Sequence, residues 1–127
     1  MNRDIKFRCK DFFDKRWVYG NYFMAKHDTH WMVDLDFTFQ PVLLSTIGQF
    51  TGLRDKNGTD IYEGDIISIK HPFMGREHVG TVIYEDYMFN IEGFSMSHFD
   101  YPNIAFSEGT QYMEVIGNIH ENTELLK

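Results

Sequence analysis

Two histidines and two carboxylates lie close together in the first third of the chain, and side chains of these types bind metal ions. His27 and His30 are three positions apart, and Asp34 and Asp36 follow shortly after. A zinc site needs three or four convergent nitrogen, oxygen or sulfur ligands. The chain has no His-Glu-x-x-His segment that would bring two imidazoles together on a helix. We therefore interpret these histidines as solvated loop residues, with a metal site as the alternative.

A second group of polar side chains lies in the glycine-rich segment 48–65. Thr51, Asp55, Asn57 and Asp65 could converge on a ligand, since they occupy two segments joined by a turn. Asp and Asn beside turns, however, commonly accept hydrogen bonds from their own backbone. The glycines lack the spacing of a phosphate-binding loop, and no Gly-Lys-Ser/Thr follows them. We expect this segment to be chiefly architectural.

No pattern in the sequence indicates catalysis. A Gly-x-Ser-x-Gly nucleophile elbow is absent. The one cysteine, Cys9, excludes both an internal disulfide and a multi-cysteine zinc site. Cys9 lies on the inward side of a predicted strand, so we expect it to be a small buried hydrophobic residue. The sequence thus predicts a protein that is not an enzyme and has no cofactor.

Apolar residues recur with a period of two, which is typical of β-strands. We expect strands over residues 5–9, 16–24, 30–37, 61–69, 79–84, 87–94 and 112–119. Gly20 within the second strand indicates a bulge or a close backbone approach, and Gly64-Asp65 bends the fourth. Many short strands separated by glycine and asparagine turns predict an all-β barrel or sandwich. We expect at most short helices, such as one turn over residues 121–126 with Asn122 as its N-cap.

Length and loop composition complete the predicted architecture. A chain of 127 residues predicts one domain over residues 1–127. The strands that begin at Gly64 and Gly80 resemble the opening strands of SH3-like barrels. Two long loops are expected, the second over residues 95–111 and packed by its own aromatic side chains, Phe99, Tyr101 and Phe106.

The charge balance limits the classes of partner. Twelve basic and nineteen acidic residues give a net charge of −7. Binding to the nucleic-acid backbone requires clustered Lys and Arg, and the densest group here is Lys6, Arg8 and Lys10. On a strand these three side chains share one face. We interpret that face as solvated, with a short anion-binding stripe as the alternative, and we do not expect the protein to coat duplex DNA.

Membrane insertion and export are not expected either. No apolar run approaches the ~18 residues of a membrane-spanning helix. The charged start of the chain is not followed by the apolar run of a signal peptide. We therefore expect a soluble protein of the cytoplasm.

Aromatic and methionine residues exceed what one small barrel readily buries. The chain has 12 Phe, 7 Tyr, 2 Trp and 7 Met, and a domain of this size hides only about two-thirds of its unfolded surface. The surplus predicts exposed apolar patches and a homo-oligomer. The alternative is that the 95–111 loop covers these residues within one chain. The candidate contact residues are Phe12, Phe13, Phe73, Met74, Met96 and Phe99.

Three segments together carry a resemblance to a known family. They are Ile5-Lys6-Phe7-Arg8, then Gly48-Gln49-Phe50-Thr51-Gly52-Leu53-Arg54-Asp55-Lys56-Asn57-Gly58 with Ile61-Tyr62-Glu63-Gly64-Asp65-Ile66, and Val115-Ile116-Gly117-Asn118-Ile119-His120-Glu121-Asn122. With Trp17 downstream of the first, this pattern resembles the YopX family of bacteriophage and prophage proteins. The resemblance implies a phage accessory protein and supplies no catalytic residues.

Function hypotheses from different classes follow. The first is a non-catalytic protein-binding module that engages a host or phage protein, since aromatic residues are favoured in interface cores. A self-assembling structural protein is the second. A small barrel that stacks the bases of single-stranded nucleic acid is the third, and the net charge of −7 counts against it. A hydrolase is the least favoured.

Overall fold

The computed structural model describes residues 6–25, 29–34, 38–70, 77–85, 88–92 and 109–126. Strands account for 67% of these residues and form antiparallel sheets. The helices among them are the short 3-10 turns η4 (Thr110–Tyr112) and η5 (Thr123–Leu126). The all-β fold class expected from the period-two pattern is therefore confirmed.

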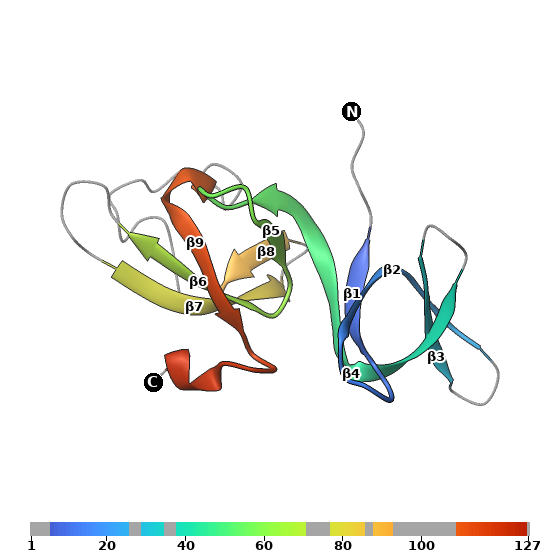
Figure 1. Ribbon diagram of the computed structural model, residues 1–127. Coiled ribbons are helices and arrows are strands. Elements are labelled where there is room, and N and C mark those ends of the chain that lie inside the picture. Colours follow the sequence, from blue (N-terminus) through green and yellow to red (C-terminus); the bar gives the residue numbers. More distant parts are fainter. Residues whose placement is uncertain are drawn as a thin grey trace. The chain divides into compact units, whose positions relative to one another are not determined.

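The chain divides into two compact units, and the boundary lies between Phe50 and Thr51. In Figure 1 the first unit runs from blue to blue-green and the second from green to red. Two compact units can belong to one domain or to two. The single domain over residues 1–127 therefore stays a prediction.

The first unit is a small closed barrel of antiparallel strands. Its strands are β1 (Phe7–Asp11), β2 (Trp17–Met24), β3 (His30–Val33) and β4 (Phe39–Arg54). β1 pairs with β2, β2 with β3, and β3 with the beginning of β4. A later part of β4 pairs with β1 and closes the sheet (Figure 1). Each strand of this unit therefore pairs with at least two others, and β4 also pairs with β5 (Asp60–Tyr62).

The core of the first unit surrounds the Cys9 thiol. Cys9, Met32 and Val42 are buried, and they are packed by Phe7, Val18, Tyr22 and Ile47. The thiol donates a hydrogen bond to the Leu43 carbonyl oxygen at 3.0 Å and lies 3.3 Å from Thr46 Oγ1. The expectation that Cys9 is a buried small residue is confirmed.

β4 is the longest strand of the described residues, and the sequence pattern did not predict it. Between Arg8 and Lys10 of β1, the partner on β4 changes from Gly48 to Leu43. Five steps along β4 therefore face two steps along β1, which is a large bulge. The bulge changes which side chains face the core, so β4 has no steady period of two for sequence reasoning to detect.

The second unit is built on a four-stranded antiparallel sheet in the order β8-β7-β6-β9. The strands are β6 (Asp65–Lys70), β7 (Glu77–Glu85), β8 (Met88–Ile91) and β9 (Met113–Asn118). They follow a hairpin made by the end of β4 and β5 (Asp60–Tyr62). The core of the second unit consists of buried apolar side chains, Ile61, Ile67, Ile69, Val82, Ile91 and Met113.

Most predicted elements of the second unit are confirmed. The bend at Gly64-Asp65 separates β5 from β6, and Gly64 has φ of 92°. The predicted strands 79–84 and 87–94 form the β7–β8 hairpin, and 112–119 corresponds to β9. The strands resembling SH3-like barrels, β6 and β7, are neighbours. Most of the 95–111 loop, including Phe99, Tyr101 and Phe106, lies outside the described residues.

The C-terminal helical turn is present as η5, but Asn122 does not cap it with its side chain. The Asn122 Oδ1 atom accepts the Asn118 backbone N–H at 3.2 Å. The bond to the helical turn is instead made by the Asn122 carbonyl oxygen, which accepts the Leu125 N–H at 3.0 Å. The prediction that the Asn122 side chain caps this turn is therefore wrong, because that side chain bonds to the end of β9 instead.

Gly20 shows the close backbone approach that the sequence indicated. A Cβ at this position would overlap the Val33 carbonyl oxygen of β3 and lie 3.0 Å from the Val33 carbonyl carbon. Gly52 also has a positive φ, of 87°, but a Cβ there would meet nothing within 4 Å.

We expect Gly20→Ala to lower the free energy of unfolding by more than about 1 kcal/mol, because the methyl group must push β2 and β3 apart. Gly52→Ala is the matched control, since it introduces only backbone strain and its loss should be smaller. Urea unfolding followed by tryptophan fluorescence measures both. Equal losses for the two variants would contradict the close approach.

Candidate protein-binding surface

A short loop joins β1 to β2, and Asp11 organises it. The Asp11 backbone N–H donates to the Arg16 carbonyl oxygen at 2.8 Å, and its carbonyl oxygen accepts the Lys15 N–H at 3.1 Å. Its carboxylate Oδ1 accepts the N–H groups of Phe13 and Asp14 at 2.8 and 3.1 Å. These bonds fix the loop through the backbone and one carboxylate, so its conformation does not depend on the Phe13 ring.

Asp14 and Lys15 stabilise the same loop from its other end. Asp14 Oδ1 accepts the Arg16 backbone N–H at 2.9 Å, and Oδ2 accepts from Arg16 Nε at 3.1 Å. The backbone bond, aided by the Arg16 charge, lowers the pKa of Asp14 despite partial desolvation. Lys15 has φ of 63°, a conformation that residues with side chains rarely adopt. Its ammonium group donates to the Phe12 carbonyl oxygen.

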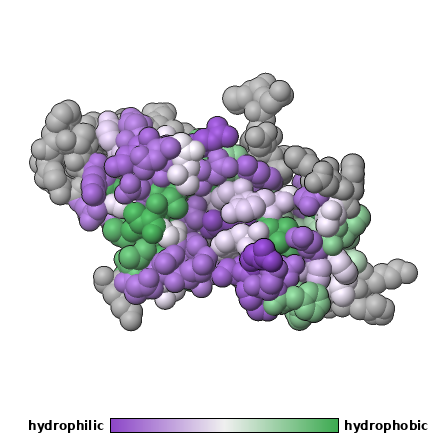
Figure 2. Space-filling view, in the orientation of Figure 1, coloured by the Kyte–Doolittle hydropathy of each residue, from purple (hydrophilic) through white to green (hydrophobic). Residues whose placement is uncertain are grey.

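The loop presents two phenylalanine rings to solvent. Phe12 is 50% exposed and Phe13 is 77% exposed. Their rings meet edge to face with centroids 5.3 Å apart, and the Phe12 N–H donates to the Pro41 carbonyl oxygen of β4 at 2.9 Å. Figure 2 shows this end of the barrel as a hydrophobic area beside strongly hydrophilic side chains. We call residues 11–16 the aromatic tip.

The aromatic tip contains two of the six contact residues named from the sequence. Phe12 and Phe13 are both exposed, as that prediction requires. The other four, Phe73, Met74, Met96 and Phe99, lie outside the described residues. The contact surface as a whole therefore stays a prediction, and the structure gives a geometry for the tip alone.

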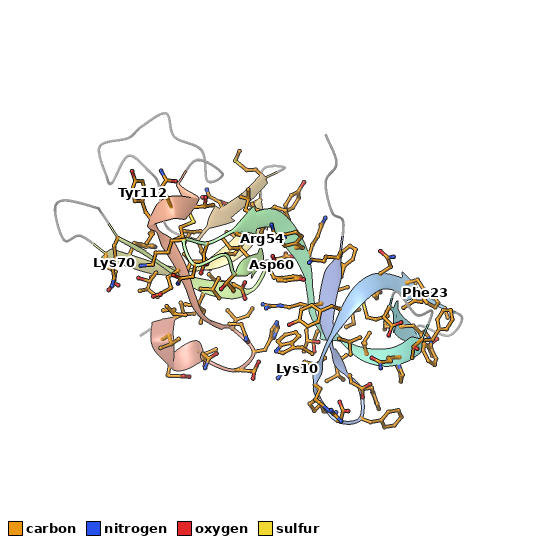
Figure 3. The ribbon with its side chains drawn as sticks, turned by 45° about the horizontal axis from the view of Figure 1, so that its top comes forward. Lys10, Phe23, Arg54, Asp60, Lys70 and Tyr112 are labelled. Carbon is orange, nitrogen blue, oxygen red and sulfur yellow. The ribbon has the colours of Figure 1, made fainter. Side chains whose placement is uncertain are left out.

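A second exposed aromatic pair, which sequence reasoning missed, lies on the outer face of the barrel. Phe23 of β2 and Phe39 of β4 are exposed, and their rings meet at 90° with centroids 5.7 Å apart. Figure 3 shows Phe23 beside other aromatic rings. Alternation puts Tyr22 and Met32 on one face and Phe23 and Trp31 on the other, but it does not say which face is turned toward the core.

The expectation of a solvated basic face at Lys6, Arg8 and Lys10 is wrong for Arg8. Arg8 is only 7% exposed, and its guanidinium carbon lies 4.6 Å from the centroid of the Trp17 ring. Lys10 Nζ lies 5.3 Å from the same ring, and Lys6 Nζ lies 4.6 Å from the Phe50 ring centroid. The attraction between the Arg8 guanidinium and the Trp17 ring helps to retain this cation where it is largely removed from solvent.

Three of the four polar side chains of the glycine-rich segment bond to the backbone, as expected. Thr51 Oγ1 donates to the Ile61 carbonyl oxygen at 2.8 Å, and Asp65 Oδ2 accepts the Tyr62 N–H at 2.7 Å. Asp55 Oδ1 accepts the Asn57 and Thr59 N–H groups, each at 2.9 Å. Asn57 is the exception, since its Nδ2 donates to Glu114 Oε2 at 3.2 Å. The expected bonding to the backbone is thus confirmed for Thr51, Asp55 and Asp65.

Asp55 also links its turn to β9, sixty residues away. Its second oxygen, Oδ2, accepts the Val115 N–H at 2.9 Å, and the neighbouring Lys56 N–H donates to the Met113 carbonyl oxygen at 3.0 Å. Burial raises the pKa of Asp55, but the N–H groups of Val115, Thr59 and Asn57 outweigh burial, so its pKa is lowered. The ionised form of the Asp55 carboxylate therefore stabilises the fold.

The segment after β9 is a second turn that is held by hydrogen bonds from its own side chains. Asn118 Oδ1 accepts the His120 N–H at 2.9 Å, and Asn118 Nδ2 donates to Glu121 Oε1 at 3.1 Å. A Cβ on Gly117 would lie 2.7 Å from Asn122 Oδ1. Glycine at 117 thus allows the Asn122 side chain to reach the end of β9, which is an architectural role.

The proposed metal ligands are only partly described. His27 and Asp36 lie outside the described residues. His30 Nδ1 is hydrogen-bonded to the Tyr22 hydroxyl at 2.7 Å, and Asp34 Oδ1 accepts the Thr38 N–H at 3.0 Å. Within the part of the chain that the structure describes, no group of three or more His, Cys, Asp or Glu side chains could hold a metal ion.

Comparison with known proteins places the chain in a family. A family model described as YopX protein matches residues 6–127. The chain belongs to the YopX family. The crystal structure of protein EF1440 from Enterococcus faecalis is similar, with 27% identity and a TM-score of 0.64, over 99% of this chain and 100% of that one. No curated protein matches.

This YopX-family chain shares its fold with that relative over essentially the whole length. The glycine-rich segment and the β9 turn, which carry the family resemblance in the sequence, are two of the places where side chains bond the backbone across turns. Family membership therefore marks shared architecture. Among the described residues, no helix has the length and apolar character needed to cross a membrane.

Asp55 should make stability depend on pH in a defined direction. Its pKa is lower in the folded chain than its ordinary value of 3.8, so its contribution is complete above that pH and is lost as pH falls through the folded pKa. We expect Asp55→Asn to lower the free energy of unfolding by about 2 kcal/mol at pH 7 and to flatten its decrease below pH 4.

Urea unfolding between pH 7 and pH 2 measures this difference. Glu124→Gln is the matched control, because the Glu124 carboxylate is exposed and removing it should leave the stability at pH 7 nearly unchanged. Parallel pH profiles for wild type and Asp55→Asn would contradict the link to β9.

Cys9 should be unreactive while the chain is folded. Burial raises the pKa of its thiol, although the Thr46 hydroxyl and the Lys10 backbone act in the opposite direction. The thiolate is the reactive form, so labelling by 5,5′-dithiobis(2-nitrobenzoate) should proceed only after urea unfolds the chain. Rapid labelling of the native protein at pH 8 would contradict the buried thiol.

Proposed function

We propose that this chain is a non-catalytic protein-binding module, used as a phage or prophage accessory factor in the cytoplasm of the host cell. Its partner is a host or phage protein. The observation that carries this proposal is the aromatic tip, where two phenylalanines are exposed on a loop held by its own hydrogen bonds. The family match supports the phage setting of the proposal through the resemblance described above.

Rigid aromatic side chains are efficient binding anchors. A phenylalanine that is already ordered loses little conformational freedom on binding, so more of the apolar burial appears as affinity. Aromatic residues in the centre of an interface dominate its energy. The Asp11 bonds order the loop before any partner arrives, and the Pro41 bond anchors it to the barrel. The tip therefore presents two exposed rings on a loop whose backbone is held by hydrogen bonds.

Self-assembly is the second candidate function. It is favoured by exposed apolar side chains on both units, such as Phe39 in the first and Ile116 in the second. Binding of single-stranded nucleic acid is less favoured, because the net charge is −7 and the cations Lys6, Arg8 and Lys10 lie over Trp17 and Phe50. Binding to phosphates requires cations that face the solvent.

The binding proposal is tested by Phe12→Ala/Phe13→Ala. The tagged chain is used to capture proteins from a phage-infected lysate, and each captured protein is then purified and titrated by calorimetry. We expect the double variant to lose about 2 kcal/mol of binding free energy or more, a roughly thirtyfold weaker affinity, with an unchanged melting temperature.

Phe39→Ala is the matched control, because this ring is also exposed in the first unit but is not on the tip. It should bind like the wild type. Equal affinity of wild type and the tip variant for every captured protein would contradict the role of the tip.

A further inference from the structure

A tight turn joins β4 to β5, and Asn57 and Gly58 lie in it. The Gly58 N–H donates to the Asp55 carbonyl oxygen at 3.0 Å, and the Asp55 N–H donates to the Thr59 carbonyl oxygen at 2.9 Å. Gly58 has φ of 81°, which is typical of a hairpin turn that ends in a left-handed glycine. Asn57 and Gly58 are exposed, and a Cβ on Gly58 would meet nothing within 4 Å. Both residues are therefore accessible to water.

An asparagine that precedes a glycine can react with its own backbone. The Gly58 nitrogen and the Asn57 side-chain carbon Cγ form a five-membered ring when they join. Glycine has no Cβ to obstruct this approach. The other asparagines of the chain are followed by Arg, Tyr, Ile or Thr, whose side chains crowd the same nitrogen. Asn57 is thus the asparagine of this sequence with the most accessible neighbouring nitrogen.

We propose that Asn57 is a site of spontaneous deamidation, and that its hydrogen bond to Glu114 restrains the reaction. Hydroxide removes the Gly58 N–H proton, and the nitrogen attacks Asn57 Cγ. The new N–Cγ bond forms and the Cγ–Nδ2 bond breaks, so that Nδ2 leaves as ammonia with a proton taken from water. Water then hydrolyses the succinimide ring at either carbonyl carbon. The products are an aspartyl and an isoaspartyl residue, and each adds one negative charge without any oxidation or reduction.

Two hydrogen bonds of the native turn oppose this reaction. The Gly58 N–H, whose proton must be lost, donates to the Asp55 carbonyl oxygen. The Asn57 Nδ2 atom donates to Glu114 Oε2 of β9 at 3.2 Å, and the turn lies beside the beginning of β9 (Figure 1). This bond fixes the orientation of the Asn57 amide, and Nδ2 cannot leave without breaking it. Deamidation therefore requires a local opening of the turn.

The product weakens the attachment of the turn to β9. An aspartyl residue at position 57 has no amide donor for Glu114 and places a second carboxylate beside it. An isoaspartyl residue also lengthens the main chain by one atom, which changes the spacing of the Asn57 and Thr59 N–H groups that Asp55 accepts. Asp55 also accepts the Val115 N–H of β9. This inference goes beyond the proposed function, because none of these residues belongs to the aromatic tip.

The test is incubation of the whole chain at pH 8 and 37 °C, followed by peptide mass spectrometry and enzymatic methylation of isoaspartate. We expect Asn57 to react before any other asparagine, and more than about tenfold faster in urea than in the native state, since both hydrogen bonds are then lost. Glu114→Ala should raise the native rate about fivefold, the effect of one hydrogen bond. Glu114→Gln should keep the wild-type rate, because the glutamine carbonyl oxygen also accepts a hydrogen bond.

Glu121→Ala is the matched control for the rate. It removes a bond of the same kind, from Asn118 Nδ2 to Glu121 Oε1 at 3.1 Å, and it should leave the rate at Asn57 unchanged. Asn57→Asp has the sequence of one product and should lower the urea midpoint of unfolding. Asn57→Asp/Glu114→Gln should recover part of that loss, because two carboxylates no longer face each other.

Three outcomes would overturn the inference. The first is a native chain in which another asparagine reacts before Asn57. The second is a native rate at Asn57 that equals the rate in urea, and the third is an equal rate for Glu114→Ala and Glu114→Gln. An unchanged urea midpoint for Asn57→Asp would contradict the predicted effect on β9.

Discussion

The pairing of β4 with three other strands is the constraint on which the rest of the structure depends. This strand pairs with β3, then with β1, and its end pairs with β5. Buried backbone N–H and C=O groups must be hydrogen-bonded, and a strand with successive partners meets that requirement only if it bends. The five-against-two bulge opposite Arg8 and Lys10 provides the bend. It also allows Thr46 to bond the Lys10 N–H at 2.8 Å.

Side-chain carboxylates and amides stabilise the turns and loops beside the strands. Asp11, Asp55 and Asn118 each accept backbone N–H groups two to four positions ahead. In all three cases the bonding is local, but Asp55 adds the bond to Val115 and so connects a hairpin turn to the last strand. The same chemistry therefore holds an exposed loop at one turn and joins distant segments at another.

Sequence reasoning predicted local features well and the long strand poorly. The turn at Asn57-Gly58, the bend at Gly64 and the close approach at Gly20 depend on the identity of one or two residues. The path of β4 depends on the strands with which it pairs, and no local sequence pattern indicates which strands those are. Arg8 shows a similar limit, since alternation gives its face correctly but says nothing of what packs on that face.

The candidate surface was predictable only in part for a related reason. An exposed aromatic residue and a buried one look alike in a sequence, so Phe12 and Phe13 could be named from their place beside a turn, whereas Phe23 and Phe39 could not. What distinguishes Phe13 physically is the set of bonds around Asp11, and a short Asp-x-x-Asp spacing alone does not reveal it.

Closure of the barrel has a consequence for misassembly. Unpaired strand edges recruit other chains and start aggregation. The four strands of the first unit close on one another, and residues 17–20 of β2 pair with β1 whereas residues 21–24 pair with β3. In the described part of the second unit, β8 stands at the end of its sheet with β7 as its one neighbour. The Asn90 side chain accepts the Ile91 N–H at 2.9 Å and so occupies a donor of this outer strand. Closure of the sheet thus limits the free strand edges of the first unit, whereas in the second unit a single side chain occupies one donor of the outer strand.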